Sequence, residues 1–182
     1  QEMLSEGNTS FYQYQGKQKS ACYHPGKKDY QPVSQSPHVL VLDTLKTDQD
    51  HLLDRNTSAS LVDLGDGVVC VEFQTKMNAI DEDTIKMMEQ AMDLVEREDR
   101  PGLVIGNEAE NFSAGANLFG VVMGAQNQLW DQLDDLVRML QNTNMRMRYF
   151  PKPVVVAPAG LALGGGSEII MHGGRVVAAA EL

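Results

Sequence analysis

The stretch Gly160-Leu161-Ala162-Leu163-Gly164-Gly165-Gly166-Ser167-Glu168 decides the fold and carries the most specific chemical signal of the chain. It follows Val154-Val155-Val156-Ala157, which is typical of a buried strand, and it precedes an apolar run that extends to His172. The pattern therefore predicts a strand, a glycine-rich turn and a helix. In such a turn, free backbone N–H groups point outward at the positive end of the helix dipole, where they favour a phosphate or a developing oxyanion.

This turn differs from the loops that bind nucleotides. It contains no Gly-Lys-Ser or Gly-Lys-Thr sequence, as a P-loop would, and its glycines lack the G-x-G-x-x-G spacing. An oxyanion site is therefore favoured over a nucleotide site. A different phosphate-binding α/β protein remains an alternative at this point.

A second turn of small residues lies upstream, Phe112-Ser113-Ala114-Gly115-Ala116-Asn117-Leu118. Its small side chains let a ligand approach the backbone and leave N–H groups available. By itself this turn is a weak signal, because many loops have such a composition.

Strand and helix patterns alternate from Ala59 onward and predict an α/β fold. The two β-rich runs around Gly65-Asp66-Gly67 indicate a hairpin. An apolar stripe of helical period follows Asp81-Glu82-Asp83 and stops at Arg100-Pro101-Gly102. The predicted order is strand 60–64, strand 68–73, helix 81–99, strand 103–105, helix 129–148, strand 154–157, helix 164–172 and a shortened strand 175–180.

Residues 1–57 have a different composition, with Gly and Pro among Gln, Lys, Ser, Asp and Tyr and no sustained apolar period. Two short runs, Ser10-Phe11-Tyr12-Gln13-Tyr14 and Val39-Leu40-Val41-Leu42, could be strands but lack neighbours with which to build a core. We therefore expect an irregular arm or linker rather than an independent domain.

The net charge of −10, from 15 Lys+Arg and 25 Asp+Glu, argues against nucleic acid and anionic membranes as partners. No apolar run reaches the ~20 residues of a membrane-spanning helix. Two cysteines are too few for a disulfide framework, so we expect a reducing compartment and a cytoplasmic location. They are also too few for a metal quartet, and Cys22 and His24 lack companion ligands, so we expect no metal. The chain starts with Gln1, which suggests a piece of a longer polypeptide.

The two turns, in this order and with Lys152-Pro153 before the strand, resemble the crotonase (enoyl-CoA hydratase/isomerase) superfamily, and Met77-Asn78-Ala79-Ile80 resembles an early element of that family. The N-terminal arm, the hairpin and the end of the chain resemble a bacterial fused 3-hydroxyacyl-CoA dehydrogenase. The resemblance implies a partial crotonase (ClpP/crotonase-like) fold of stacked ββα units for residues 58–182. It implies that residues 1–57 are a linker or the tail of an upstream dehydrogenase portion.

The resemblance also implies roles for individual residues. The thioester carbonyl of an acyl-CoA would lie between the backbone N–H groups of Ala116 and Gly165, and Glu168 would orient or deprotonate the attacking water. In the alternative interpretation, Glu168 only complements the helix dipole. Lys76 would meet a CoA phosphate, or else is an exposed lysine. The full set of substrate-binding candidates is Lys76, Asn78, Ala79, Ala114, Gly115, Asn117, Leu118, Leu163 and Gly164.

Departures from the family pattern limit these implications. The second catalytic glutamate of the family falls beyond Leu182, Asn117 stands where many members have Asp, and Ser167 where Cys is frequent. We therefore expect this segment alone to be inactive, with no cofactor of its own, and NAD to belong to the dehydrogenase portion of a homo-oligomeric parent. A non-catalytic CoA-binding or assembly domain is the alternative. His172 is either a proton shuttle or an ordinary packed or surface histidine.

Overall fold

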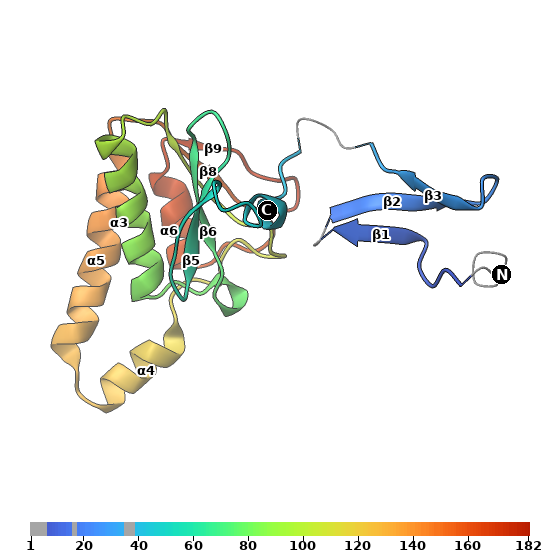
Figure 1. The fold of residues 1–182 in the computed structure, drawn as a ribbon. Helices are drawn as coiled ribbons and strands as arrows, with labels where there is room; N and C mark the ends of the chain where they lie inside the picture. Colours follow the sequence, from blue (N-terminus) through green and yellow to red (C-terminus); the bar gives the residue numbers. More distant parts are fainter. Residues whose placement is uncertain (1–6, 16–17, 35–38) are drawn as a thin grey trace. The chain divides into compact units, whose positions relative to one another are not determined.

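The computed structural model describes residues 7–15, 18–34 and 39–182 (Figure 1). The chain divides after Asp48 into two compact units, which are described separately below. No helix in the described part of the chain is both long and apolar enough to cross a membrane.

The larger unit contains a six-stranded sheet in which each strand lies beside its neighbour in the sequence. The first three strands are antiparallel and the last four are parallel to one another. A tight turn suffices for the antiparallel hairpin, whereas each parallel pair requires a crossover, which here contains a helix. The strands are β4 (Leu52–Arg55), β5 (Ala59–Asp63), β6 (Val69–Phe73), β7 (Leu103–Gly106), β8 (Val154–Ala157) and β9 (Arg175–Val176).

Three helices pack close to this sheet and to one another: α3 (Glu82–Arg97), α5 (Trp130–Arg148) and α6 (Gly165–His172). Helix α3 lies beside α5 in Figure 1 and contacts β5, β6 and β7. It begins where the sequence predicts, because the carboxylate of Asp81 accepts a hydrogen bond from the N–H of Thr84. The predicted α/β fold is therefore confirmed, with β5, β6 and α3 as its first ββα unit.

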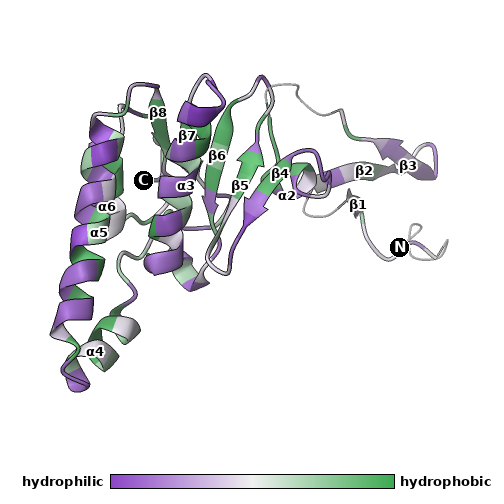
Figure 2. Cartoon of the chain, turned by 60° about the vertical axis from the view of Figure 1, so that its left-hand side comes forward, coloured by the Kyte–Doolittle hydropathy of each residue, from purple (hydrophilic) through white to green (hydrophobic). Residues whose placement is uncertain are grey.

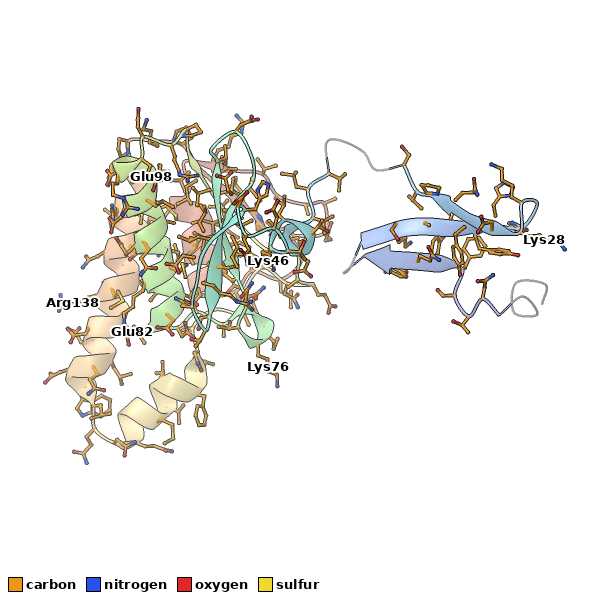
Figure 3. The ribbon with its side chains drawn as sticks, in the orientation of Figure 1. Lys28, Lys46, Lys76, Glu82, Glu98 and Arg138 are labelled. Atoms are coloured by element: carbon orange, nitrogen blue, oxygen red, sulfur yellow. The ribbon has the colours of Figure 1, made fainter. Side chains whose placement is uncertain are left out.

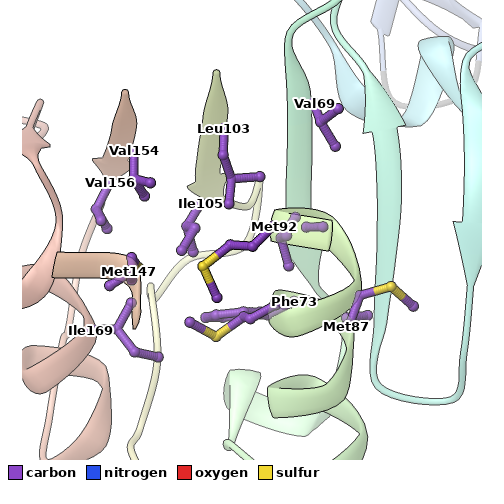
Figure 4. Close-up of a cluster of buried hydrophobic side chains, with 14 of the residues drawn as sticks. Val69, Phe73, Met87, Met92, Leu103, Ile105, Met147, Val154, Val156 and Ile169 are labelled. Carbon is purple, nitrogen blue, oxygen red and sulfur yellow. The ribbon is translucent and has the colours of Figure 1, made fainter. Parts of the chain in front are cut away.

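The core lies between the sheet and these helices (Figure 4). The predicted stripe of α3 is fully buried, and Met87 and Met92 fill the space between helix and strands. The methionines of this helix are therefore core residues. Other buried members shown in the figure are Val69, Phe73, Leu103, Ile105, Met147, Val154, Val156 and Ile169.

Two helical segments of the larger unit were not predicted, η1 (Lys76–Asn78) and α4 (Leu118–Gln126). Helix α4 has no polar face that would reveal a helical period, and Figure 2 shows apolar colouring over most of it. None of its residues is buried, and Leu118 and Phe119 are 70% and 76% exposed. A nearly uniform apolar segment of this length cannot be assigned from periodicity.

The smaller unit contains a three-stranded antiparallel sheet of β1 (Tyr12–Gln15), β2 (Gln18–His24) and β3 (Asp29–Pro32). The expectation of an irregular arm is therefore wrong here, although the short strand near Tyr12 is confirmed. Aromatic contacts between neighbouring residues and strands replace the missing apolar alternation: the rings of Tyr23 and Tyr30 are 5.7 Å apart, and the Lys19 ammonium lies 4.2 Å from the centre of the Tyr12 ring.

Two further features of residues 1–57 differ from the expectation. The run beginning at Val39 is not a strand, since its last residue starts the short helix α2 (Leu42–Leu45). Strand β4 pairs with β5 and so belongs to the larger unit, which places the boundary after Asp48 rather than after Thr57. The sequence of β4 has no apolar alternation, so only its pairing identifies it. That residues 1–57 derive from an upstream dehydrogenase stays a prediction.

Arg146 on α5 connects this helix to α3. Its guanidinium forms ion pairs with Glu89, Asp93 at 2.7 Å and Glu96 at 2.9 Å. Burial by itself would lower the pKa of Arg146, but the hydrogen bonds to these carboxylates raise it on balance. Arg138, eight residues earlier on α5, forms an ion pair with Asp134 of its own helix and points outward in Figure 3.

We predict that Arg146→Met lowers the free energy of unfolding by ~1 kcal/mol, because three neighbouring carboxylates lose their shared cation. Arg138→Met is the matched control and should change stability little. Urea unfolding followed by circular dichroism measures both. Equal stability of the two variants would show that the Arg146 cluster does not fasten α5 to α3.

A second ion pair joins the hairpin to the chain after α3, with Arg100 Nη1 2.7 Å from the Asp63 carboxylate. Burial would raise the pKa of Asp63, but hydrogen bonds from Arg100 and from the N–H of Gly65 lower it on balance below the ordinary aspartate value. Asp63 therefore stabilises the fold above the pKa that it has in the unfolded chain. This contribution is lost as the pH falls through its folded pKa.

We predict that Asp63→Asn destabilises the chain at pH 7 and that the difference from the unaltered protein shrinks as the pH falls below 4. Urea unfolding at several pH values measures this. Asp66→Asn, in the exposed turn of the same hairpin, is the control and should show no such convergence. A constant difference at all pH values would contradict the assignment.

Candidate functional site

The two glycine-containing turns lie side by side beyond the ends of β7 and β8. The N–H of Ser113 donates to the carbonyl of Leu161 at 3.1 Å, and the N–H of Leu163 donates to the carbonyl of Ser113 at 2.9 Å. These bonds form a parallel bridge between Ser113 and Ala162. The structure therefore brings together two turns that are far apart in the sequence.

The segment from Met77 to Ile80 completes this arrangement on the other side of the first turn. The N–H of Ile80 donates to the Gly115 carbonyl at 2.8 Å, and the N–H of Asn117 donates to the Ile80 carbonyl at 2.9 Å. The N–H of Ala114 donates to the carbonyl of Met77 at 3.1 Å. Backbone hydrogen bonds thus hold the first turn between two other segments.

Gly115 and Gly165 allow the turns to approach each other. Gly115 has a φ of +88°, and a Cβ atom there would lie 2.8 Å from the Leu163 carbonyl oxygen. A Cβ atom at Gly165 would lie 4.0 Å from the backbone nitrogen of Ala116. The two residues predicted to supply the oxyanion donors are therefore neighbours in space.

The backbone N–H groups of residues 113–117 differ in their hydrogen bonding. Those of Ser113, Ala114 and Asn117 donate to carbonyls, and that of Gly115 donates to the Ser113 hydroxyl at 3.0 Å. Within the described part of the chain, the N–H of Ala116 alone among these five has no acceptor. The N–H of Gly165, at the first position of α6, also has none among those residues.

Glu168 lies in the first turn of α6 and is exposed. Its carboxylate makes no hydrogen bond to another described residue, whereas its backbone carbonyl lies 2.7 Å from Nδ1 of His172. This geometry is compatible with both interpretations of the carboxylate, as a base that faces solvent and as a charge that complements the helix dipole. The His172 ring contacts the backbone of its own helix, which favours the packed-histidine interpretation.

The predicted substrate-binding residues fall into two groups. Lys76 is exposed and points away from the fold in Figure 3, and Leu118, Leu163 and Gly164 are exposed as well. Ala79 and Ala114 are half-buried, and Gly115 is buried. The exposed residues can contact a ligand directly, whereas the buried ones contribute by setting the conformation of the backbone in the turns.

The side chains of two predicted residues form hydrogen bonds within the protein. Asn78 is 3% exposed, and its Nδ2 donates to the Asn111 carbonyl at 2.9 Å. The Asn117 Oδ1 accepts from the N–H of Gly120 at 3.4 Å and caps α4. An amide does this as well as the carboxylate of the family pattern, so the Asp-to-Asn departure preserves the cap.

Two cavities are relevant to the placement of a ligand. One of about 360 Å³ adjoins the second turn and is mostly apolar, with the lining residues Gly160, Leu161, Ala162, Leu163, Ser167, Ile170, Met171 and Leu182. Another of about 440 Å³ lies between β4, β5 and α3 and contains no residue of either turn. The free N–H groups of Ala116 and Gly165 belong to the turns, and the cavity of about 440 Å³ is lined by residues outside the turns. We therefore assign the site to the turns.

Two contributors were not identified from the sequence. Asn111 accepts from the N–H of Leu161 at 3.1 Å through Oδ1, and the Ser113 hydroxyl is fully buried between η1 and the first turn. A small polar residue in an otherwise apolar turn is a signal for Ser113, but its partners are distant in the sequence. Among the described residues, no group of three His, Cys, Asp or Glu side chains is arranged for a metal ion.

Comparisons with known proteins identify the family of the chain. Residues 67–181 match the family Enoyl-CoA hydratase/isomerase. A probable 3-hydroxyacyl-CoA dehydrogenase of Bacillus subtilis is 38% identical over 99% of this chain and 22% of its own length. A putative fatty acid oxidation complex trifunctional enzyme of Rickettsia felis is 28% identical over 86% of this chain and 21% of its own length.

Solved structures agree with the fold. A probable enoyl-CoA hydratase from Mycobacterium tuberculosis aligns with a TM-score of 0.57 and 28% identity, over 67% of this chain and 50% of its own. An enoyl-CoA hydratase from Shewanella pealeana aligns with a TM-score of 0.57 and 26% identity, over 77% and 51%. The chain thus spans about a fifth of the curated relatives and about half of these structures. By its matched residues, it belongs to the enoyl-CoA hydratase/isomerase family.

Proposed function

We propose that this chain is part of a fatty-acid β-oxidation protein and supplies the oxyanion hole for hydration of a 2-enoyl-CoA. The observation that carries the proposal is the N–H of Ala116, which has no acceptor among the described residues and lies beside Gly165. A Cβ atom at Gly165 would lie 4.0 Å from the Ala116 nitrogen. Addition of water to an enoyl thioester places negative charge on the thioester oxygen. Two preorganised N–H donors stabilise that charge more than they stabilise the substrate.

Glu168 is the proposed base. It lies three residues after Gly165 on α6, so the same helix that presents one donor also carries the carboxylate. Its exposed carboxylate has no competing partner among the described residues and is free to orient a water. Hydration also needs a proton donor, which we assign to a residue in the remainder of the longer protein.

The acyl-CoA would cross the two turns. The apolar cavity beside the second turn, which Leu161 and Leu163 line, fits a hydrocarbon chain better than a polar group. Lys76, exposed near the first turn, would meet a phosphate of CoA. The apolar cavity and the exposed lysine support an acyl-CoA thioester as the substrate.

The proposed function extends to the remainder of the longer protein. We place an NAD-dependent 3-hydroxyacyl-CoA dehydrogenase there, as the name of the Bacillus subtilis relative suggests. The product of hydration would then be the substrate of that dehydrogenase. We further propose that the parent is cytoplasmic and homo-oligomeric.

A non-catalytic CoA-binding or assembly domain is the second candidate. The observation that favours it is the exposure of Glu168 in the first turn of α6, where a carboxylate complements the dipole without taking part in chemistry. On this proposal the turns are retained because they hold the fold together.

We predict that Glu168→Gln in the natural protein lowers kcat for hydration of crotonyl-CoA at least ~100-fold, because a general base is lost while the shape is kept. Glu110→Gln, an exposed carboxylate before the first turn, is the control and should leave kcat unchanged. The 182-residue chain alone should show no turnover.

Each result of this assay separates the candidates. Hydration by the natural protein that is insensitive to Glu168→Gln would support the dipole interpretation of this residue. Robust turnover by the 182-residue chain, independent of Glu168, would contradict the proposed mechanism.

A further inference from the structure

Ser113 is a buried polar residue at the centre of the site, and the proposed reaction does not yet use it. Its side chain is fully buried. The hydroxyl donates to the carbonyl of Asn78 at 2.7 Å and accepts from the N–H of Gly115 at 3.0 Å. A single oxygen therefore bonds to η1 and to the first turn.

The backbone of Ser113 bonds to the second turn. Its N–H and carbonyl pair with Leu161 and Leu163, as described above. A Cβ atom at Gly166 would lie 2.8 Å from the Cβ of Ser113, so α6 begins in direct contact with this residue. Ser113 thus contacts all three segments that form the site.

We propose that Ser113 is a positioning residue that selects which N–H group of the first turn is presented to the thioester oxygen. This inference rests on the proposed function. By occupying the N–H of Gly115, the hydroxyl leaves the N–H of Ala116 as the free donor. It also fixes the peptide between Ala114 and Gly115, which helps to hold the φ of +88° at Gly115 in the absence of a side chain there.

Removal of the hydroxyl has two physical consequences. The N–H of Gly115 and the carbonyl of Asn78 lose a partner in a buried position, where water cannot replace it without rearrangement. The peptide between Ala114 and Gly115 then loses its hydrogen bond, so the N–H of Gly115 becomes a second free donor and the φ of Gly115 is less restrained. A change in that φ tilts the N–H of Ala116 away from the thioester oxygen, although the Gly115 carbonyl stays bonded to the N–H of Ile80. Preorganisation is lost while the substrate-binding surface remains.

Ser60 provides a matched control for a merely structural effect. It is also fully buried, donates to Glu72 Oε2 at 3.0 Å and accepts from Gln74 Nε2 at 3.0 Å. It lies on β5, and none of these partners belongs to the turns. Ser60→Ala and Ser113→Ala therefore remove the same group with the same number of hydrogen bonds at different places.

The first test uses amide hydrogen exchange of the 182-residue chain by NMR. In Ser113→Ala we expect the Gly115 amide to exchange at least ~10-fold faster relative to the amides of β6 and β7, whereas Ser60→Ala should leave this ratio unchanged. An unchanged ratio in Ser113→Ala would show that the hydroxyl does not hold the turn and would overturn the proposal.

The second test measures crotonyl-CoA hydration by the natural protein. We expect Ser113→Ala to lower kcat at least ~10-fold with KM within ~3-fold, since a donor in the transition state is misplaced. Ser113→Cys, which keeps a weak donor and acceptor, should recover part of kcat, and Ser60→Ala should match the unaltered protein.

The outcomes distinguish this inference from the function on which it rests. Absence of hydration by the unaltered natural protein would overturn the proposed function. Hydration by that protein, with kcat unaffected by Ser113→Ala or equally reduced by Ser60→Ala, would overturn the role of Ser113 and leave the proposed function intact.

Discussion

The parallel hydrogen bonds between Ser113 and the chain around Ala162 are the interaction on which the site depends. They continue the pairing of β7 and β8 beyond the ends of these strands, so the turns inherit their relative placement from the sheet. The core beneath the strands fixes the sheet, and α6 starts directly from the second turn. A change in register between β7 and β8 would therefore separate the proposed donors, although neither strand carries one.

Glycine makes this close pairing sterically possible. A side chain at Gly115 or Gly166 would occupy space that the opposing turn already fills. The site consists mainly of backbone atoms as a result, with Ser113 and Asn111 as the polar side chains that bind them together. This explains why nearly apolar turns create a polar site.

Sequence reasoning predicted the helices and strands of the larger unit that have a clear period, including the stripe of α3 and the run of β8. It missed β4 and the sheet of the smaller unit, because their stability comes from strand pairing and aromatic contacts rather than from apolar alternation. Of the site, the turns were predictable from their composition. The hydrogen-bond partners of Ser113 and Asn111 were not, since long-range backbone pairing leaves no local signal.

The mixed sheet has a consequence for the order of folding. Strands β5 and β6 are joined by a short hairpin, and such a hairpin closes within microseconds. Residues 107–153 separate β7 from β8, so their pairing must pay a far larger loop-closure entropy before it gains any contact. The turns depend on that slow pairing. A nascent chain therefore acquires its hairpin early and its site late.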